Sequence, residues 1–453
     1  MTNIRGKHIA VIGAARSGLA AARMLKKYGA DVYVSDSSDI HTEVKSKLIS
    51  EHIAFEENRH SSRAENVEMA VISPGVPDKA PIIKYYQREG IPVYSEIEAA
   101  SWFNRSPIVA VTGSNGKTTV TSWMAHMWET AGRSYLLAGN IGRAFSDIID
   151  ETQPGTTVIL EISSFQLDHI HSFRPDISVI LNITPDHLDR YEFSFNNYAE
   201  SKLRILENQQ AEDIFIYNQD DSFLVEKVQS VSSRDIHPRF YSFSIEHEVN
   251  QGAFIRNDQI IFKINDSEEF LMNTSEVGLP GRHNLHNGLA TALAARLSEI
   301  KSESIRESLQ TFEGVEHRLE LVRILNGVKY INDSKATNIN AVWFALDSFN
   351  VPIVLILGGR DKGNDYNELK SQIREKVHTL IAIGEAREAI RKQLKDVVPN
   401  FHDTETLEDA VRIGHKKAKR GEIVLLSPAC SSFDMFEDYE HRGQVFKMAV
   451  QNL

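Results

Sequence analysis

The fold is decided by residues 109 to 119, which read Val109-Ala110-Val111-Thr112-Gly113-Ser114-Asn115-Gly116-Lys117-Thr118-Thr119. The apolar start predicts a buried strand and the residues after Thr119 predict a helix, so both glycines lie in the turn between them. Backbone N–H groups of such a turn, together with the helix N-terminus, can bind phosphate. Lys117 would reach the outer phosphates and the Thr118 hydroxyl would bind Mg²⁺, so we predict an ATP or GTP site.

The spacing of this loop departs from the common motif GxxxxGK[ST], because Val111 occupies the position of the first glycine. What remains is the shorter pattern Thr-Gly-x-x-Gly-Lys-Thr-Thr. Glycine-rich turns between a strand and a helix often bind nothing in α/β proteins. The Lys-Thr pair at the helix start nevertheless favours a nucleotide site.

Length and composition indicate a globular protein of several domains. The chain has 453 residues, and about 150 residues per domain predicts three domains. Its hydrophobic content of 42% and charged content of 25% are ordinary for a globular protein. The net charge of −12 argues against a nucleic-acid binder, which needs a basic surface.

Cysteine usage and hydropathy predict a cytoplasmic protein. The only cysteine, Cys430, cannot form an internal disulfide or a thiolate metal cluster, which favours a reducing compartment. Residues 1–7 have no signal-peptide character, and no run approaches the roughly 18 apolar residues of a membrane span. We expect no membrane span and a monomer.

The N-terminal residues predict a small Rossmann-like domain. A strand over 7–12 leads into the turn Gly13–Gly18, and a second strand over 31–35 ends in Asp36, 18 residues after Gly18. This spacing is similar to the dinucleotide fingerprint, although Ala15 replaces its middle glycine and a plain turn is the alternative. Further strands over 69–73 and 91–94 complete a domain of residues 1–96, and residues 100–107 predict a linker.

Polar residues follow two strands of the second predicted domain, residues 97–313. Glu161 follows the strand over 157–160, and His187 comes shortly after the strand over 177–181. Ligands of open α/β sheets bind at these strand ends, and both side chains can bind a divalent metal. Such residues are often structural, but a phosphate loop in the same sheet favours a metal site.

Lys202 lies on the apolar face of a helix predicted around 195–208. At helical spacing it shares that face with Tyr198, Ala199 and Leu206. A buried unpaired ammonium is costly, so Lys202 is predicted to be paired, neutral or chemically modified. A lysine that extends its amine to solvent is the alternative.

The third predicted domain, residues 314–453, is another open α/β sheet. Strands over 328–331, 352–357, 379–383 and 422–426 each end in polar or glycine-rich turns. Lys335, Lys362 and Ser432 follow three of them, and they can receive an anionic small molecule. Before this domain, residues 211–275 contain strands without evident chemistry, and Asn287 either contacts an adenine edge or caps a helix.

In matching order, several motifs resemble the Mur ligase family, whose members form amide bonds at the expense of ATP. They are Thr112–Thr119, Gly139–Gly142, Glu161–Leu167, Asp186-His187, Glu316–Arg318, Asn332–Asn338 and Leu426–Ser432. Residues 163–167 and 427–430 are similar to the D-glutamate-adding branch. The resemblance implies a ligase of peptidoglycan synthesis that joins D-glutamate to UDP-N-acetylmuramoyl-L-alanine, and therefore a role in cell wall biogenesis, cell shape and cell division.

The resemblance also implies residues that bind ATP and two Mg²⁺ ions. The ATP-binding residues would be Gly113, Ser114, Asn115, Gly116, Lys117, Thr118, Thr119, Asn287, Arg318 and Asp333. The Mg²⁺ ligands would be Thr118, Glu161, His187 and Lys202, the last of them carbamylated. Lys117, Glu161, His187, Lys202 and Lys335 would be catalytic.

The substrates would bind at the first and third domains. For the nucleotide sugar the resemblance implies Arg16, Ser17, Asp36, Ser37, Gly75, Asn140, Ser163 and Gln166. For D-glutamate it implies Thr337, Lys362, Ser432 and Phe433, together with Lys335. The carboxylate would react through an acyl phosphate and a tetrahedral intermediate. The predicted architecture is α/β throughout, with a P-loop ATPase-like, mostly parallel central sheet between two Rossmann-like domains.

Four other functions are compatible with parts of the sequence. A sibling ligase would add a different amino acid, and a folylpolyglutamate synthetase would share the central domain and its loop. An NAD-dependent oxidoreductase would use residues 7–36 and leave Lys117, Glu161, His187 and Lys202 without a role. A non-catalytic nucleotide switch would hydrolyse ATP without forming an amide.

Overall fold

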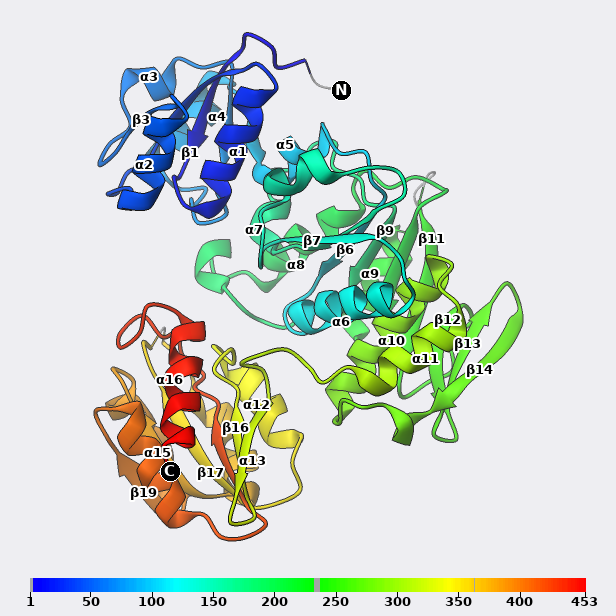
Figure 1. Cartoon of the computed structure of the whole chain (residues 1–453), viewed down its shortest axis with the longest axis vertical. Helices are drawn as coiled ribbons and strands as arrows, with labels where there is room; N and C mark the ends of the chain where they lie inside the picture. The colour runs from blue at the N-terminus through cyan, green and yellow to red at the C-terminus, as the bar shows by residue number, and fades with distance from the viewer. Residues whose placement is uncertain (1–2, 232–236, 362) are drawn as a thin grey trace. The chain divides into compact units, whose positions relative to one another are not determined.

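The computed structural model describes residues 3–231, 237–361 and 363–453, and these residues form sheets of five, nine and six strands (Figure 1). The chain divides into two compact units. The first holds residues up to Val277 together with His286–Thr311, and the second holds Gly278–Leu285 and Phe312–Leu453. The first unit contains the first two sheets and the second unit contains the third. Among the described residues, no helix is both long and apolar enough to span a membrane.

The N-terminal sheet is entirely parallel, in the order β3-β2-β1-β4-β5. Its elements are β1 (His8–Ile12), α1 (Arg16–Lys27), β2 (Asp31–Ser35), α2 (Thr42–Ser50), β3 (Ala54–Glu56), α3 (Ser62–Glu65), β4 (Met69–Ile72), α4 (Pro81–Glu89) and β5 (Val93–Ser95). β2 and β3 lie on one side of β1, and β4 and β5 lie on the other side. The carboxyl ends of β1 and β4 therefore flank the position where open sheets bind ligands. There Ser73 Oγ donates to Gly13 O at 2.9 Å.

The segment after this sheet is packed, and the predicted linker is wrong at its start. Helix α5 (Glu96–Ser101) is followed by buried Trp102 and Phe103. The Glu98 carboxylate accepts hydrogen bonds from Trp102 Nε1 and from the backbone N–H groups of residues 171–173. Burial alone would raise the pKa of Glu98, but these bonds and that of the Ser172 hydroxyl hold it below its ordinary value. The hydrophobic rings and this carboxylate fix the segment to the second sheet.

The second sheet has the order β14-β13-β12-β11-β10-β9-β6-β8-β7; β13 is antiparallel to both of its neighbours, β12 and β14, and all other adjacent pairs are parallel. Its strands are β6 (Ile108–Thr112), β7 (Tyr135–Gly139), β8 (Thr157–Glu161), β9 (Ile177–Ile180), β10 (Ile214–Asn218), β11 (Arg239–Ser244), β12 (Gly252–Arg256), β13 (Gln259–Ile264) and β14 (Ser267–Asn273). β6 is buried along its whole length, as expected for a parallel strand covered on both faces. The order of strands reverses between β6 and β9, so their carboxyl ends flank the second ligand position.

Helices and short 3₁₀ turns connect these strands (Figure 1). They are α6 (Lys117–Thr130), η1 (Phe145–Glu151), α7 (Ser164–Leu167), η2 (Leu188–Tyr191), α8 (Phe195–Leu203), η3 (Arg204–Leu206), α9 (Ser222–Val231), η4 (Thr274–Glu276), α10 (Arg282–Leu297) and α11 (Ser302–Thr311). The helix predicted over 195–208 is therefore found as two elements, the α-helix α8 followed by the tighter 3₁₀ turn η3. α11 packs against α6, where Trp123 Nε1 donates to Ser308 O at 3.2 Å.

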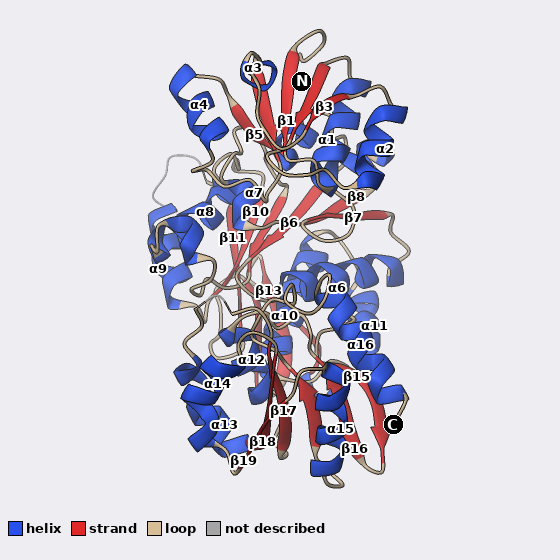
Figure 2. Cartoon of the chain, turned by 90° about the vertical axis from the view of Figure 1, so that its left-hand side faces the viewer, coloured by secondary structure: helices blue, strands red, loops and turns tan. Residues whose placement is uncertain are grey.

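The third sheet has the order β15-β16-β20-β17-β18-β19, and only β15 is antiparallel to its neighbour. Its elements are β15 (Glu320–Leu325), β16 (Val328–Asn332), α12 (Ile339–Asp347), β17 (Ile353–Gly358), η5 (Tyr366–Leu369), α13 (Lys370–Lys376), β18 (Val377–Ile383), α14 (Arg387–Leu394), η6 (Lys395–Val397), β19 (Asn400–Asp403), α15 (Leu407–Lys417), β20 (Ile423–Leu426) and α16 (Tyr439–Gln451). Helices α12 to α14 cover one face, and α15 and α16 cover the other (Figure 2). The loops after β16, β17 and β20 follow the carboxyl ends of their strands, where ligands of open α/β sheets bind.

Candidate active site

The phosphate-loop glycines adopt conformations that other residues rarely take. Gly113 has φ 152° and Gly116, which precedes α6, has φ 92°. A Cβ at Gly116 would lie 2.6 Å from Asn287 Oδ1, so the loop also needs glycine there for space. Asn287, predicted to contact the nucleotide, is thereby placed against the loop from α10. The loop leads directly into a 14-residue helix, whose first backbone N–H groups can bind a phosphate group.

The segment after β9 holds this loop in place. Asn115 N donates to Asn182 Oδ1 at 2.9 Å, and Asn182 Nδ2 donates back to Asn115 O at 3.0 Å. Ser114 Oγ donates to Thr184 O at 2.8 Å. Sequence reasoning missed Asn182 and Thr184 as positioning residues, although both stand at a strand end where polar residues were noted. The phosphate loop and the segment leading to His187 therefore form one connected structure.

Glu161 brings the predicted metal and substrate residues together. Its Oε2 accepts a hydrogen bond from Thr118 Oγ1 at 2.7 Å, and its Oε1 accepts one from Asn140 Nδ2 at 3.0 Å. The three side chains come from the start of α6, the end of β8 and the residue after β7. A hydroxyl and a carboxylate at this separation are the oxygen donors that Mg²⁺ prefers, so Thr118 and Glu161 fit that ion.

Lys202 is buried beside the loop, and the alternative of an amine extended to solvent is wrong. Only 1% of the residue is exposed, and its Nζ donates to Gly113 O at 3.0 Å. Nζ also lies 4.7 Å from the centroid of the Tyr198 ring. Burial, followed by the positive charge of Lys117, lowers the pKa of Lys202 well below its ordinary value. The environment therefore favours the neutral amine.

Lys117 lies folded over its own loop. Its Nζ donates to Gly113 O at 2.7 Å and to Ser114 O at 2.9 Å. The neighbouring Thr119 Oγ1 is buried and has no hydrogen-bond partner among the described residues. Gly113 O thus accepts from two lysines, Lys117 and Lys202, which places two amines at the same turn.

His187 lies at the start of η2 in a left-handed conformation with φ 51°. Its ring is 5.1 Å from the centroid of Phe165, and its Nε2 is 3.8 Å from Asp186 Oδ2. Ser163, at the N-cap of α7, closes a capping box with Gln166, whose Oε1 accepts from Ser163 N and Ser163 Oγ. These predicted substrate residues therefore fix the start of the helix that carries Phe165.

In the N-terminal sheet Asp36 fixes the first turn. Its Oδ2 accepts from Ala14 N at 2.7 Å, and its Oδ1 accepts from Ser38 N at 2.9 Å. Arg16 Nη2 donates to Asn140 O at 3.1 Å, which joins this turn to the second sheet. The other residues predicted for the nucleotide sugar stand open at the same sheet edge: Ser17 is half-buried, Ser37 is exposed, and a Cβ at Gly75 would meet no atom within 4 Å.

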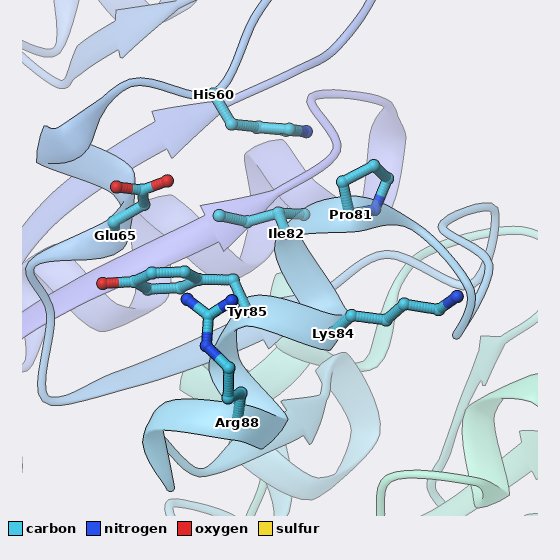
Figure 3. A pocket seen from close by; sticks show the side chains of 7 residues that line it. All are labelled: His60, Glu65, Pro81, Ile82, Lys84, Tyr85 and Arg88. Carbon is cyan, nitrogen blue, oxygen red and sulfur yellow. The ribbon is translucent and has the colours of Figure 1, made fainter.

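A cavity of about 520 Å³ lies beside α4 and contains none of the predicted site residues (Figure 3). It is lined by His60, Glu65, Pro81, Ile82, Lys84, Tyr85 and Arg88. His60 connects it to the sheet edge, since its Nδ1 lies 2.7 Å from Ser35 Oγ, one residue before Asp36. The Arg88 side chain covers the Tyr85 ring and pairs with Glu89, so neither ring nor cation points freely into the cavity.

Asp333 is the central carboxylate of the second unit. Its Oδ2 accepts from Ser427 Oγ at 2.8 Å, and its Oδ1 accepts from Leu319 N at 3.2 Å. Burial raises the pKa of Asp333 to about 7, against a smaller opposing effect of these bonds and of Arg318. Asp333 and half-buried Arg318, predicted to bind ATP, belong to this unit, whereas Asn287 belongs to the first.

The residues predicted to bind D-glutamate lie in the loops after β16 and β20. Lys335 Nζ is 5.3 Å from the Tyr439 ring centroid, and Thr337 is half-buried in the same loop. In the other loop Ser432 is buried, whereas Phe433 is 61% exposed. Lys362 lies outside the described residues.

Arg442 joins these two loops, and sequence reasoning missed it. The side chain is fully buried. Its Nη2 donates to Ser334 O at 2.8 Å and to Cys430 O at 3.1 Å, and its Nε donates to Ser334 Oγ at 2.9 Å. Burial lowers the pKa of Arg442 to about 10, so the guanidinium stays charged at neutral pH. No carboxylate among the described residues lies within 4.0 Å of it.

Two clusters of the described residues bring three acidic or histidine ligand atoms within 4.8 Å of one another. They are Asp220–Glu246–His247 and Glu316–His317–Glu320. Neither contains Glu161 or His187. In the second cluster Lys447 Nζ lies 2.8 Å from Glu316 and 2.6 Å from Glu320, so a lysine already neutralises these carboxylates.

Known proteins match this chain from end to end. Family models match residues 8–81 (MurD N-terminal domain), 111–295 (Mur ligase middle domain) and 317–430 (Mur ligase, glutamate ligase domain). A UDP-N-acetylmuramoylalanine--D-glutamate ligase of Salinibacter ruber is 46% identical over 456 residues, 99% of each chain. The chain belongs to the Mur ligase family. A relative of the same name from Chloroherpeton thalassium is 44% identical, also over 99% of each chain.

Solved structures of Mur-type ligases share the fold. The TM-score is 0.60 with a pseudomurein peptide ligase type C of Methanothermus fervidus, at 20% identity over 99% of this chain and 100% of that chain. The TM-score is also 0.60 with the UDP-N-acetylmuramate-alanine ligase MurC of Thermotoga maritima, at 18% identity over 98% of this chain and 99% of that chain. At these identities the likeness concerns the fold, and it confirms the predicted three-domain α/β architecture.

Family membership decides between the classes of function that the sequence left open. The full-length relatives are named as ligases, so the predicted ligase class is confirmed and the oxidoreductase built on residues 7–36 is wrong. A nucleotide switch without an amide product is wrong for the same reason. ATP is the nucleotide that this family implies, and Mg²⁺ accompanies it.

Proposed function

We propose that the chain is an ATP-dependent ligase that joins D-glutamate to UDP-N-acetylmuramoyl-L-alanine during peptidoglycan precursor synthesis in the cytoplasm. One observation carries the proposal: Thr118, Asn140 and Glu161 meet beside a glycine loop that also contacts Lys117 and buried Lys202. Full-length relatives bearing this substrate pair in their name support the choice within the family.

The reaction needs ATP because a carboxylate is a poor electrophile. The alanyl carboxylate attacks the γ-phosphorus of ATP, forming an acyl phosphate while the bond to ADP breaks. The amine of D-glutamate then adds to the acyl carbon and loses a proton, and inorganic phosphate leaves as the amide forms. The amine of Lys117 and the backbone N–H groups of the loop stabilise the charge that develops at each stage.

In this proposal the phosphates of ATP lie along Gly113–Gly116, with Ser114, Asn115, Thr119 and Asn287 around them. Lys117 leaves its two carbonyl acceptors and donates to the outer phosphates. Thr118, Glu161 and His187 would hold Mg²⁺, which when bound neutralises phosphate charge. Arg318 and Asp333 are also proposed to bind the nucleotide, and the hydroxyl of Ser427 keeps the Asp333 carboxylate oriented.

We propose that Lys202 is carbamylated and orients a second Mg²⁺ ion. Its neutral amine, favoured by burial, can add to CO₂ and lose a proton, which converts the side chain into a carbamate anion. The change puts an anion, in place of an uncharged amine, beside the positive charge of Lys117. The buried position of the amine beside Gly113 O supports this modification, since an unmodified ammonium there is costly.

The substrates occupy the remaining predicted residues. Arg16, Ser17, Asp36, Ser37 and Gly75 bind the UDP part, and Asn140, Ser163 and Gln166 bind the muramoyl-alanine part. Lys335, Thr337, Lys362, Ser432 and Phe433 bind D-glutamate, with Lys335 also stabilising the reacting groups. Two observations support these assignments: the open edge of the first sheet at Ser37 and Gly75, and the exposed Phe433 ring beside buried Ser432.

We further propose three functional domains, residues 1–96, 97–313 and 314–453, in a monomer. Three separate sheets support the division, and each matched family model lies within one of these three ranges.

Mass spectrometry of the product tests the proposed function. Purified chain is incubated with ATP, Mg²⁺, UDP-N-acetylmuramoyl-L-alanine and one amino acid at a time. We expect the amide only with D-glutamate, together with stoichiometric ADP and phosphate. Product with L-lysine or diaminopimelate instead would identify a sibling ligase, and glutamylation of a folate substrate would identify a folylpolyglutamate synthetase.

A further inference from the structure

Arg190 joins the two sheets of the first unit through a pair of short hydrogen bonds. It belongs to η2, three residues after His187. Its Nη1 donates to Pro74 O at 2.7 Å and its Nη2 donates to Val76 O at 2.7 Å. These carbonyls flank Gly75 in the loop after β4, at the strand-order reversal of the N-terminal sheet. One planar guanidinium therefore holds both sides of the loop predicted to receive the nucleotide sugar.

The guanidinium is itself held in a fixed position. Its carbon lies 4.0 Å from the centroid of Phe165, a ring that also packs against His187 at 5.1 Å and Tyr191 at 6.0 Å. Arg190 Nε is buried without a hydrogen-bond partner among the described residues. The Nε donor thus stays unpaired while the two terminal amines of Arg190 donate to the loop. Burying an unpaired donor costs free energy, and the two hydrogen bonds to the loop carbonyls offset that cost.

A second contact ties the far end of the same loop to the second sheet. Asp78 lies two residues after Val76, and its Oδ1 is 2.7 Å from His169 Nε2. Residues 74–78 are therefore attached at three points to the part of the chain that carries Phe165 and His187. The position of this loop is set by the second sheet as much as by β4.

We propose that Arg190 is a positioning residue for the nucleotide-sugar substrate, an inference that rests on the proposed function. By fixing residues 74–76 relative to His187, it sets how far the bound substrate extends toward the phosphate loop. A substrate held at its UDP end must present its carboxylate to ATP at the other end. A shift of about 1 Å at such a distance can lower the rate about 100-fold.

The test compares Arg190 with Arg204, a matched arginine in the same unit. Arg204 also donates from its two terminal amines to two backbone carbonyls, those of Asp168 and Ile170, but both acceptors lie within the second sheet's own domain. Steady-state kinetics with each substrate varied in turn is measured for Arg190→Ala, Arg190→Lys and the same two changes at Arg204.

For Arg190→Ala we expect kcat/KM for UDP-N-acetylmuramoyl-L-alanine to fall at least about tenfold, with the KM for ATP within about twofold of the wild-type value. Free guanidinium at millimolar concentration should restore part of the loss. Arg190→Lys, which keeps the charge but cannot bridge both carbonyls, should show the same selective defect, and the Arg204 variants should not.

Two results would overturn the inference. One is unchanged kinetics toward the nucleotide sugar in both Arg190 variants. The other is an equal loss toward all three substrates that Arg204→Ala reproduces, because this would indicate a general structural effect. If the wild-type chain forms no D-glutamyl amide, the proposed function fails instead, and the two failures are therefore distinguishable.

Discussion

Among the described residues, each unit buries one lysine or arginine side chain, Lys202 in the first and Arg442 in the second, and the two side chains have opposite environments. Within the part of the chain that the structure describes, the Lys202 amine makes one hydrogen bond, to Gly113 O, and the amine of Lys117 donates to the same carbonyl. Arg442 in the second unit donates to three carbonyls and one hydroxyl. Burial lowers the pKa of both, but only Arg442 has acceptors enough to remain a cation.

The difference separates a reactive site from a structural one. A guanidinium with its donors satisfied by carbonyls keeps two loops at a fixed distance and has nothing to gain from a chemical change. An amine with one acceptor and a like charge nearby is stabilised by losing its proton or by becoming an anion. Lys202 is therefore suited to modification and Arg442 to support, and four variants can break or sharpen this contrast.

The largest effect is expected for Lys117→Ala, which removes the like charge beside Lys202 as well as the phosphate contact. Turnover should fall more than 100-fold, because positioning and neutralising the transferred phosphoryl group contributes several kcal/mol to the rate. Lys376→Ala is the control, since Lys376 Nζ also donates to two backbone carbonyls. Retention of more than about a tenth of the wild-type kcat would contradict the role of Lys117 in phosphate transfer.

Lys202→Ala tests whether the buried amine works as a carbamate. Activity should fall about 100-fold and be partly restored by short carboxylic acids such as acetate, which place a carboxylate in the space of the lost side chain. Lys227→Ala is the matched control, because Lys227 Nζ also lies over an aromatic ring, 5.4 Å from the centroid of Phe223. An absence of rescue, together with an intact-protein mass that shows no added CO₂ on the wild type, would speak against carbamylation.

Sequence patterns of a few residues were sufficient to predict those features around Lys202 and Arg442 that depend on neighbouring positions in the chain. The glycine loop, the polar strand ends and the inward face of Lys202 all follow from spacings of a few residues. The contacts of Arg442 do not, because its acceptors at Ser334 and Cys430 come from separate loops that only the fold brings together. Arg190 was missed for the same reason: its partners lie more than 110 residues away in the chain.

Arg442→Met tests the structural side of the contrast. Three backbone carbonyls would lose their donor, so the second unit should be destabilised by about 3 kcal/mol. The KM for D-glutamate should rise about tenfold as the loops carrying Lys335 and Ser432 separate, whereas the KM for the nucleotide sugar should not change. Urea unfolding and kinetics on both substrates measure these effects.

Arg323→Met is the control for that substitution. Arg323 Nη1 also donates to two carbonyls, those of Val450 and Gln451, but at the far end of α16. It should destabilise the unit less and leave the KM for D-glutamate unaltered. Equal effects of the two substitutions on that KM would show that Arg442 does not position the loops.

The smallest effect concerns Asp333, whose pKa is raised to about 7 by burial, from an ordinary value near 3.8. Between these two values the folded state binds a proton that the unfolded state has lost, so the stability of the second unit falls as pH rises. Above pH 7 the full penalty is present, at most about 4 kcal/mol at roughly 1.4 kcal/mol per pKa unit.

The substitution Asp333→Asn introduces a side chain that cannot ionise, so it should remove this dependence of stability on pH. Hydrogen exchange of β16 and β20 amides, compared at pH 5.5 and 8, measures it. Glu98→Gln should leave that slope intact, because Glu98 belongs to the first unit and its pKa is lowered rather than raised. A wild-type slope equal to that of Asp333→Asn would show that Asp333 is already ionised at pH 5.5, and that the second unit stabilises this anion as effectively as it stabilises the Arg442 cation.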